Sequence, residues 1–413
     1  MTIVQINTVC GFGSTGHISE EIATISNSLG YKNYVAYGIG TSKYEFSYKI
    51  GTRLESLFHN VFFTRLLGLH GFGSYYATKR FLKWIDGIKP DIIHIHNLHS
   101  NYINYRLLYN YIENNNIPIV FTLHDCFHFT GKCSYYTCAN CFKWKTLCNH
   151  CPLYRSTAAP SFLFDNSSFL FSDKKKIYSR LNNVWVIAVS KWLMSEAKQS
   201  ILNTNKHVID YIYNWIDCEK FKPANAIEID KFYKKYKLNK STKYLLTVSQ
   251  IWDRRTSRYQ DAVKLAGMLP EDYRLLLVGK LALGTTISND KIVYIPYIDS
   301  SESMAVAYSI AYAYIHLSIQ DTFGLVIAEA MACGCTPIVF NSTACAETPA
   351  QFGHIVPPHN VQAIVEVLPS INKDIKIVED MIAYVKTNYG KETNIKRYIE
   401  LYKSITMQQL NSK

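Results

Sequence analysis

The sequence predicts an α/β protein with two domains, each built on a doubly wound parallel sheet. Its 413 residues exceed the usual size of a single domain. Short apolar runs alternate with helix-length segments throughout, which is typical of parallel sheets covered by helices. The alternation restarts after the polar, lysine-rich stretch 220–242, and we place the domain junction just before it, near Val208–Asp217.

Five strands are expected in the first half, each a short apolar run that ends in polar residues. They lie at Ile3–Ile6, Tyr34–Tyr37, Pro90–His96, Ile117–Leu123 and Val184–Val189. A helix is expected at Ile18–Leu29, after a glycine-rich turn. These elements predict a Rossmann-like domain over residues 1–210.

The second half repeats the pattern. Strands are expected at Tyr244–Ser249, Arg274–Val278, Ile292–Ile295, Tyr312–Leu317 and Thr336–Val339. Helices fit between them at Tyr259–Met268, Ser303–Tyr308 and Gly324–Cys333. We therefore expect a second Rossmann-like domain over 211–390, facing the first across a cleft. A C-terminal helix within 391–413, over Asn394–Leu410, is expected to pack across that cleft.

The charge balance predicts a basic surface, because 44 Lys and Arg residues face 32 Asp and Glu, a formal net charge of +12. Phosphates of nucleotides, nucleic acids or lipids are natural partners of such a surface. The sequence has no recognised nucleic-acid motif, so we expect no nucleic-acid partner. The start of the chain lacks a signal-peptide pattern, and no apolar stretch reaches the roughly 20 residues of a membrane span. We expect a cytoplasmic protein whose cysteines are mostly reduced.

The most informative segment, 321–334, has the sequence DTFGLVIAEAMACG. Backbone N–H groups at the helix start after the Phe-Gly turn favour a phosphate or a sugar oxygen. Glu329 lies eight residues after Asp321, about two helical turns, so both carboxylates can face one ligand and accept hydrogen bonds from its hydroxyls. The alternative is structural, with Asp321 as a helix cap and Glu329 as a surface residue.

This segment resembles the motif of GT-B glycosyltransferases of family four (group 1), and in particular of bacterial capsular and exopolysaccharide glycosyltransferases. The resemblance implies that Asp321 contacts the donor sugar and that Glu329 holds the ribose hydroxyls. It also implies that the amides of Phe323, Gly324 and Leu325 contact the sugar and the diphosphate. The first acid is Asp where the commonest form has Glu, which shortens its reach by one methylene.

A basic loop, 248–258, has the sequence VSQIWDRRTSR. Similar sequences carry an Arg-Lys-Gly triplet that neutralises the donor diphosphate, and here the triplet is Arg255-Thr256-Ser257. Arg255 can make bidentate phosphate contacts, and we expect it to stabilise the leaving group, with help from Arg254 or Arg258. A solvated basic loop is the alternative.

Two features of the first half match the family in order. The loop Gly13-Ser14-Thr15-Gly16 resembles the family's loop near the donor phosphates. The segments 94–99 (HIHNLH) and 121–125 (FTLHD) place histidines where strands end, which is where α/β sheets bind ligands. A Thr-x-His-Asp match implies that His124 lies beside the transferred sugar. We expect His96, Asn97 and Asp125 to bind the acceptor.

Six cysteines fall within the insertion 126–151, including the pairs Cys138-x-x-Cys141 and Cys148-x-x-Cys151. Four thiolates bind zinc tetrahedrally, and a closed site of this kind would stabilise the loop. We predict a structural zinc site of Cys138, Cys141, Cys148 and Cys151, in which Cys133 or Cys126 could replace one member. Reduced free cysteines, disulfides and an iron–sulfur cluster remain alternatives.

Together these observations predict a retaining hexosyltransferase for bacterial surface polysaccharide. The resemblance implies a UDP- or GDP-sugar donor bound by 211–390, no catalytic metal, and a glycan or polyprenyl-linked acceptor bound by 1–210. The helix Tyr75–Trp84 mixes aromatic residues with cations and is expected to touch anionic membrane at the inner face, or to be an ordinary solvated helix. A non-catalytic nucleotide- or glycan-binding relative, a zinc-dependent interaction module, and an epimerase or phosphorylase remain open.

Overall fold

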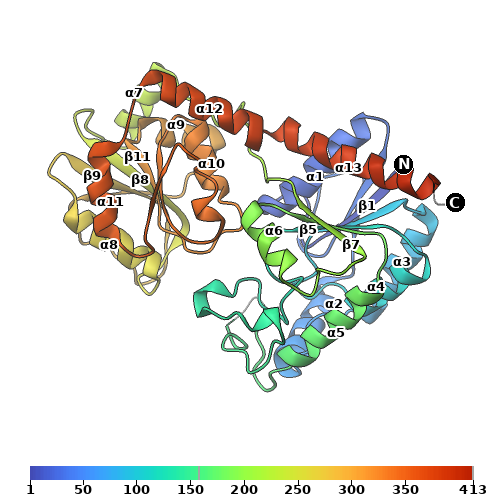
Figure 1. Ribbon diagram of the computed structural model, residues 1–413. Coiled ribbons are helices and arrows are strands. Elements are labelled where there is room, and N and C mark those ends of the chain that lie inside the picture. Colours follow the sequence, from blue (N-terminus) through green and yellow to red (C-terminus); the bar gives the residue numbers. More distant parts are fainter. Residues whose placement is uncertain (157–158, 412–413) are drawn as a thin grey trace. The chain divides into compact units, whose positions relative to one another are not determined.

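The computed structural model describes residues 1–156 and 159–411, and the chain divides into two compact units (Figure 1). Met1–Ile212 and the chain from Ile395 onwards form the first unit, and Tyr213–Asn394 form the second. Each unit is a parallel sheet with helices on its faces, which is the fold class predicted from the sequence.

The first unit contains a seven-stranded sheet of order β3-β2-β1-β4-β5-β6-β7, in which all neighbours are parallel. Its strands are β1 (Thr2–Asn7), β2 (Lys32–Tyr37), β3 (Ser47–Lys49), β4 (Ile92–Ile95), β5 (Ile119–Leu123), β6 (Val184–Ala188) and β7 (His207–Tyr211). β4 and β5 are buried along their whole length, which explains their continuous apolar sequences. The strand order reverses between β1 and β4, so ligands are expected at the carboxyl ends of these two strands.

The helices of the first unit include one π-helix, η1. They are α1 (Gly13–Ser28), α2 (Arg53–Phe58), η1 (His59–Leu66), α3 (Tyr75–Ile88), α4 (Tyr105–Asn114), η2 (Thr137–Ala139), η3 (Lys143–Lys145), α5 (Ser167–Arg180) and α6 (Lys191–Lys198). α13 (Lys391–Asn411) packs on this unit from Ile395 onwards. Its buried Tyr402 hydroxyl lies 2.6 Å from His94 Nδ1, and its Tyr398 hydroxyl lies 2.9 Å from Thr122 Oγ1.

The second unit contains a six-stranded parallel sheet of order β10-β9-β8-β11-β12-β13, which reverses between β8 and β11. The strands are β8 (Lys243–Trp252), β9 (Tyr273–Leu281), β10 (Ile292–Ile295), β11 (Ala313–His316), β12 (Pro337–Phe340) and β13 (His354–Val356). The helices are α7 (Ala226–Lys235), α8 (Ser257–Met268), α9 (Ser301–Ile310), α10 (Leu325–Ala332), η4 (Thr343–Ala346), α11 (Val361–Val367), η5 (Leu368–Ser370) and α12 (Ile375–Tyr389). The core is apolar, with Trp252 buried and bonded through Nε1 to the Val278 carbonyl at 2.9 Å.

All ten expected strands occur within a few residues of their predicted positions, whereas β3, β7 and β13 were not predicted. Each of these three is an edge strand, so its residues are less buried and its sequence is less apolar. One further expectation is corrected, because α1 begins at Gly13, before Ile18. The stretch 220–242, for which no element was predicted, contains α7. None of the helices in the described ranges is long and apolar enough to be a membrane-spanning helix.

Candidate active site

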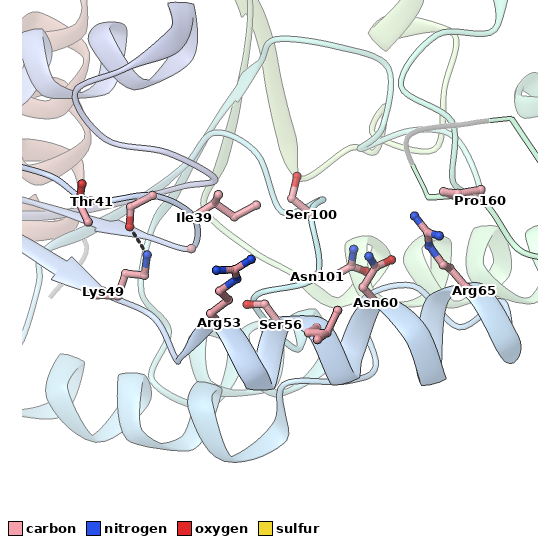
Figure 2. A pocket seen from close by; sticks show the side chains of 13 residues that line it. Ile39, Thr41, Lys49, Arg53, Ser56, Asn60, Arg65, Ser100, Asn101 and Pro160 are labelled. Carbon is pink, nitrogen blue, oxygen red and sulfur yellow. Dashed lines mark hydrogen bonds between the residues drawn. The ribbon is translucent and has the colours of Figure 1, made fainter.

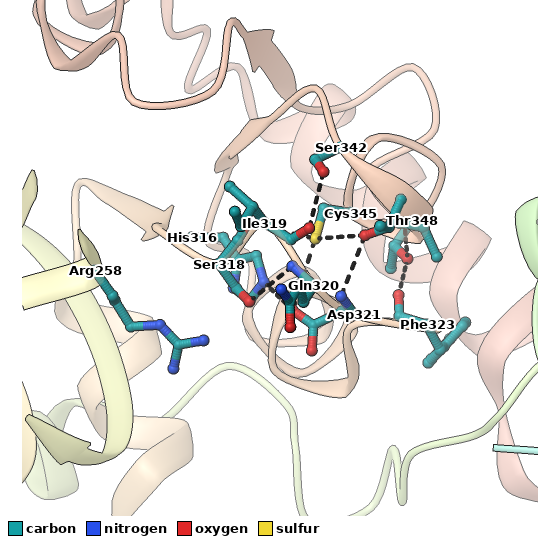
Figure 3. Close-up of polar contacts among 12 residues, drawn as sticks. Arg258, His316, Ser318, Ile319, Gln320, Asp321, Phe323, Ser342, Cys345 and Thr348 are labelled. Atoms are coloured by element: carbon teal, nitrogen blue, oxygen red, sulfur yellow. Dashed lines mark hydrogen bonds and ion pairs between the residues drawn. The ribbon is translucent and has the colours of Figure 1, made fainter. Parts of the chain in front are cut away.

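Asp321 follows the carboxyl end of β11, one of the two central strands between which the strand order of the second sheet reverses. Its Oδ2 atom lies 2.6 Å from His316 Nε2, and His316 Nδ1 lies 3.0 Å from the hydroxyl of Tyr314 (Figure 3). The Asp321 amide donates to Thr343 Oγ1 at 3.2 Å, and its carbonyl accepts from the Ala344 amide at 3.2 Å. The carboxylate is therefore fixed from both its side chain and its backbone.

The charge state of Asp321 follows from its neighbours. Burial alone would raise its pKa, but the hydrogen bond from His316 and the positive field of His316 and Arg258 together hold the pKa below its ordinary value. The group is thus an ionised hydrogen-bond acceptor at neutral pH.

α10 begins directly after a turn that only glycine fits. Gly324 has a φ of +86°, and a Cβ atom there would lie 2.7 Å from Ile327 Cδ1. Phe323 is buried against the rings of Tyr213 and Tyr389, at centroid distances of 5.8 and 5.1 Å, which anchors the turn. No side chain caps this helix start and its first turn holds no acidic residue, so the leading amides, beginning with that of Leu325, favour an anion.

Glu329 lies on α10, where its Oε2 atom accepts a hydrogen bond from the Tyr308 hydroxyl at 3.1 Å. Burial raises the pKa of Glu329 to about 7. The side chain is therefore divided between its protonated and ionised forms near neutral pH, and a ligand that donates hydrogen bonds to it would favour the ionised form.

The arginines of the basic loop differ in where they point. Arg255 is exposed and forms a bidentate ion pair with Asp253, with Nη2 to Oδ2 at 2.5 Å and Nε to Oδ1 at 3.0 Å. Arg254 is also exposed. Thr256, which stands where similar sequences have lysine, is the N-cap of α8. Arg258, in the first turn of α8, donates to Ser249 Oγ at 3.2 Å and points toward the Asp321 loop (Figure 3).

In the first unit, the loop after β1 leads into α1 with its glycines in close contact. The Gly11 amide donates to the Gly16 carbonyl at 3.2 Å, and Asn7 Nδ2 donates to the Thr15 carbonyl at 2.9 Å. Gly13 and Ser14 are exposed at the helix start, where no side chain caps the helix. The start of α1 thus leaves backbone amides without a side-chain cap, and the role of this loop at donor phosphates stays a prediction.

The histidines at the ends of β4 and β5 form a chain of hydrogen bonds that fixes their tautomers. Gln5 Nε2 donates to Ser19 and Asn33, so Gln5 Oε1 is the acceptor for His96 Nε2 at 2.8 Å. His96 Nδ1 then accepts from His124 Nε2 at 2.9 Å. Burial lowers the pKa of His124 to about 4, although Asp125 acts in the opposite direction. His124 is thus neutral at pH 7, with its lone pair on Nδ1.

The other two predicted acceptor residues lie close by in the chain. Asp125 Oδ2 lies 3.1 Å from His99 Nε2, and Asp125 Oδ1 accepts from the Phe127 amide at 2.8 Å. Burial would raise the pKa of Asp125, but His99 and this amide hold it below the ordinary value. Asn97 is buried, and its Oδ1 atom has no hydrogen-bond partner among the described residues. Buried acceptors are normally satisfied, so this unpaired oxygen is unusual, and the role of Asn97 in acceptor binding stays a prediction.

The four predicted metal ligands do not all meet. Cys138 is exposed, whereas Cys141, Cys148 and Cys151 line a small cavity together with Cys133.

A larger cavity, of about 680 Å³, was not predicted (Figure 2). Arg53, Ser56, Asn60 and Arg65 follow one face of α2 and η1 and point into it. The remaining lining comes mainly from the loops after β2 and β4, with Lys49 at the end of β3. It is Gly38, Ile39, Gly40, Thr41, Lys49, Leu57, Ser100, Asn101 and Pro160. Its cations, Lys49, Arg53 and Arg65, do not belong to any recognised motif, so the sequence alone did not indicate this cavity.

Comparisons with known proteins agree with this geometry. Residues 228–388 match the family described as Glycosyl transferases group 1, and residues 41–220 match the family described as Glycosyltransferase Family 4. Together the two matches span well over half of the chain. A stretch of 194 residues is 24% identical to WcaC of Escherichia coli, whose name assigns it to glycosyl transfer in colanic acid biosynthesis. That match covers 44% of this chain and 46% of WcaC, so it spans less than half of the relative's length.

Solved structures are similar over nearly the whole chain. A glycosyltransferase from Rickettsia africae has a TM-score of 0.68 at 17% identity, with 98% of both chains covered. HepE of Anabaena, solved in complex with UDP, has a TM-score of 0.67 at 13% identity, covering 98% of this chain and 100% of HepE. At these identities the likeness establishes the fold. With the two family matches, it places this chain in the group 1 glycosyltransferases of GT-B fold.

Proposed function

We propose that the protein is a retaining glycosyltransferase that moves a hexose from a nucleoside diphosphate to a glycan or lipid-linked acceptor in surface polysaccharide biosynthesis. The observation that carries the proposal is the arrangement around α10 in the second unit. An ionised acid, an uncapped helix start and a second acid follow one another there, and Arg258 points toward the first of them.

Each part of the donor has a counterpart in this arrangement. The amides at the start of α10 and the Arg258 guanidinium would bind the diphosphate. Glu329 would accept hydrogen bonds from the two ribose hydroxyls, and Asp321 from a hydroxyl of the sugar. HepE, of the same fold, was solved with UDP, so UDP-sugars are the first donors to test and GDP-sugars the second.

The chemistry that fits these residues is a front-face displacement. The bond from sugar C1 to the diphosphate oxygen breaks, and the acceptor oxygen bonds to C1 on the same face. The acceptor proton passes to the departing phosphate oxygen. Arg258 and the α10 amides would stabilise the charge that develops on the leaving group, so a divalent metal is not required. We assign the His124 ring a place beside the transferred sugar, as the resemblance to the family implies.

Nucleotide binding should strengthen as the pH rises from 6 to 8, by up to about tenfold. Glu329 has a pKa of about 7 in the free protein, and ribose hydroxyls that donate to it favour its ionised form, so its pKa falls on binding. Binding is therefore disfavoured below pH 7, where this proton must first be lost. Calorimetric titration with UDP and GDP at pH 6, 7 and 8 measures the effect.

Glu329→Gln should bind more weakly and lose the pH dependence, while the exposed control Glu379→Gln should behave as the wild type. A wild-type affinity that does not change with pH would contradict the ribose role. Turnover of a sugar nucleotide by the wild-type protein would exclude the non-catalytic alternative, and absence of both binding and turnover would contradict the proposed function.

For the acceptor, we propose a phosphorylated lipid-linked sugar bound in the cavity of the first unit. Arg53, Arg65 and Lys49 give this cavity a positive lining, while Asn60 and Asn101 offer amides for sugar hydroxyls. Lys49 Nζ donates to the Gly40 carbonyl, which holds that cation at the cavity wall (Figure 2). Guanidinium groups bind phosphate in bidentate fashion, so a diphosphate-linked acceptor fits the lining.

An exposed apolar surface borders the cavity and supports a lipid-borne acceptor. We call it the apolar ridge; it consists of Leu54, Leu57, Phe58, Val61, Phe62 and Leu66 of α2 and η1, with Phe162, Leu163 and Phe164. Leu54 is 76% exposed and Phe58 60% exposed, and Arg65 lies over the Phe162 ring at 5.7 Å. Apolar groups beside cations suit a membrane surface. The contact through α3 also stays a prediction: its Tyr76 is 73% exposed, whereas its Trp84 stacks on Tyr48 at 4.5 Å.

Arg53→Ala should raise the KM for a phosphorylated acceptor by roughly 10- to 100-fold, because it removes a charge-assisted hydrogen bond, without changing UDP affinity. The double variant Leu54→Ser and Phe58→Ser should slow transfer to an acceptor in anionic vesicles and leave transfer to its water-soluble, short-chain analogue unchanged. Initial rates with the two acceptors separate these effects.

Lys206→Ala and Leu29→Ser, exposed at other places in the first unit, serve as matched controls. An Arg53→Ala variant with wild-type KM would rule out the cavity as the phosphate site. Equal rates of the ridge variant and the wild type on vesicles would rule out the membrane contact.

A further inference from the structure

The segment between β5 and α5 is long and has little regular structure of its own. Within its described residues, from 124 to 166, the helical elements are η2 and η3, each of three residues. It nevertheless buries Trp144, whose ring packs against Phe129 and Tyr136 at centroid distances of 4.9 and 5.1 Å. Loops of this length normally need a further constraint to hold one conformation.

Four cysteines of this segment surround a single cavity of about 20 Å³, which is room for one water molecule or one ion. They are Cys133, Cys141, Cys148 and Cys151. The other three cysteines are close enough to Cys133 for their charges to act on its thiol, and all four line this one space. All four are free thiols.

We propose that this cavity is a structural zinc site with Cys133, Cys141, Cys148 and Cys151 as its ligands. Cys138, although part of a C-x-x-C pair, is exposed and does not line the cavity. Four thiolates complete the coordination of zinc, so the site is closed to water and takes no part in chemistry. The soft sulfur ligands select zinc over magnesium or calcium.

Groups around the cysteines make hydrogen bonds of the kind that orient the ligands of a metal site. The Gly131 amide donates to Cys148 Sγ at 3.3 Å, and the Cys151 amide donates to Asp165 Oδ2 at 2.6 Å. A Cβ atom on Gly131 would lie 2.6 Å from the Ser167 carbonyl oxygen, so only glycine brings its amide this close to the sulfur.

Two buried lysines lie close enough to the cysteines for their charges to interact. Lys174 is 3% exposed and donates to the carbonyls of Phe127 and Thr130 at 2.7 and 3.0 Å. Lys132 is 1% exposed and donates to the Tyr154 carbonyl at 3.2 Å. Carbonyl groups orient both side chains. Zinc with four thiolates carries two negative charges, which these two lysines would balance in their ammonium form.

Binding draws the sulfur atoms closer together. No three sulfur atoms of the four cysteines all lie within 4.8 Å of one another. Among the described residues, the one group of His, Cys, Asp or Glu that meets this limit is His316, Asp321 and Cys345, which belongs to the donor site. Zinc–sulfur bonds of about 2.3 Å place tetrahedral sulfurs about 3.8 Å apart. The cysteine side chains must therefore rotate into the cavity as the metal enters.

Metal content tests the ligand set. Protein purified without chelators should contain about one zinc per chain by mass spectrometry, and Cys138→Ser should retain it, whereas Cys133→Ser and Cys141→Ser should lose most of it. Zinc retained by Cys133→Ser and lost by Cys138→Ser would overturn this set in favour of the two C-x-x-C pairs. A wild-type protein without zinc, which also takes up none when zinc chloride is added, would overturn the site itself.

Alkylation of the wild-type protein gives the same answer if a variant fails to fold. Iodoacetamide should label Cys138 with the zinc in place, and should label Cys133, Cys141, Cys148 and Cys151 only after chelation. Labelling of Cys133 at the same rate before and after chelation would overturn its role as a ligand. Nucleotide binding by the second unit is read separately, so failure of this site is distinguishable from failure of the proposed function.

Discussion

Replacing Arg258 by alanine should weaken binding of the nucleoside diphosphate by about 30- to 150-fold, because a charge-assisted hydrogen bond to phosphate contributes about 2–3 kcal/mol. The corresponding change at Arg255 should cost at most about fivefold, since its side chain is exposed and already paired with Asp253. Calorimetry with UDP and GDP measures both affinities, and initial rates with a sugar donor measure the effect on kcat.

The two variants control for each other, because each removes one guanidinium from the same loop and helix start. Arg258→Lys should recover part of the affinity, since it restores the charge without the bidentate geometry. A large loss in Arg255→Ala with little change in Arg258→Ala would return the role to Arg255, as the resemblance to the family implies.

Lowering the pH from 7.5 to 5.5 should destabilise the first unit by up to about 8 kcal/mol, while the second unit changes little or gains stability. Burial lowers the pKa values of His59, His124 and His128 to about 4, and those of His70, His94 and His96 well below the ordinary value. All six lie in the first unit. Unfolding lets them bind protons below about pH 6.5, which favours the unfolded state by about 1.4 kcal/mol for each histidine at pH 5.5.

Glu329 acts with the opposite sign in the second unit. Its folded pKa of about 7 lies above the unfolded value, so its contribution to stability is present at low pH and is lost as the pH rises through 7. Hydrogen exchange with mass spectrometry in graded urea resolves the two units. His128→Gln should reduce the pH dependence of the first unit, and the exposed control His17→Gln should not. Equal acid destabilisation of both units would contradict this account.

The sequence was sufficient for the central strands and insufficient for the edges of the sheets. β4 and β5 are buried on both faces, and such strands need continuous apolar runs that stand out in a sequence. β3 and β7 lie at the edges of their sheet, where one side of each strand has no neighbour and polar residues are tolerated. The fold class could be derived because it depends on the central strands.

The candidate site was predictable where a motif fixes the spacing, as for Asp321 and Glu329. It was not predictable where the direction of a side chain decides the role. Arg258 points toward Asp321 because Thr256 starts α8 and places residue 258 on its first turn, and sequence alone does not reveal that helix phase. In the same way, spacing favours Cys138 over Cys133, although the folded loop leaves Cys138 exposed.

The return of α13 to the first unit has a consequence for synthesis on the ribosome. Thr406 lies against Met1, and the Tyr402 hydroxyl bonds His94, so the first unit is completed by residues made after the whole of Tyr213–Asn394. At roughly 5–20 residues per second, those partners arrive on the order of 10–40 seconds after β7 has been translated. During that interval the site of α13 on the nascent first unit stays uncovered, and the second unit, being continuous in sequence, can finish folding before the unit that began first.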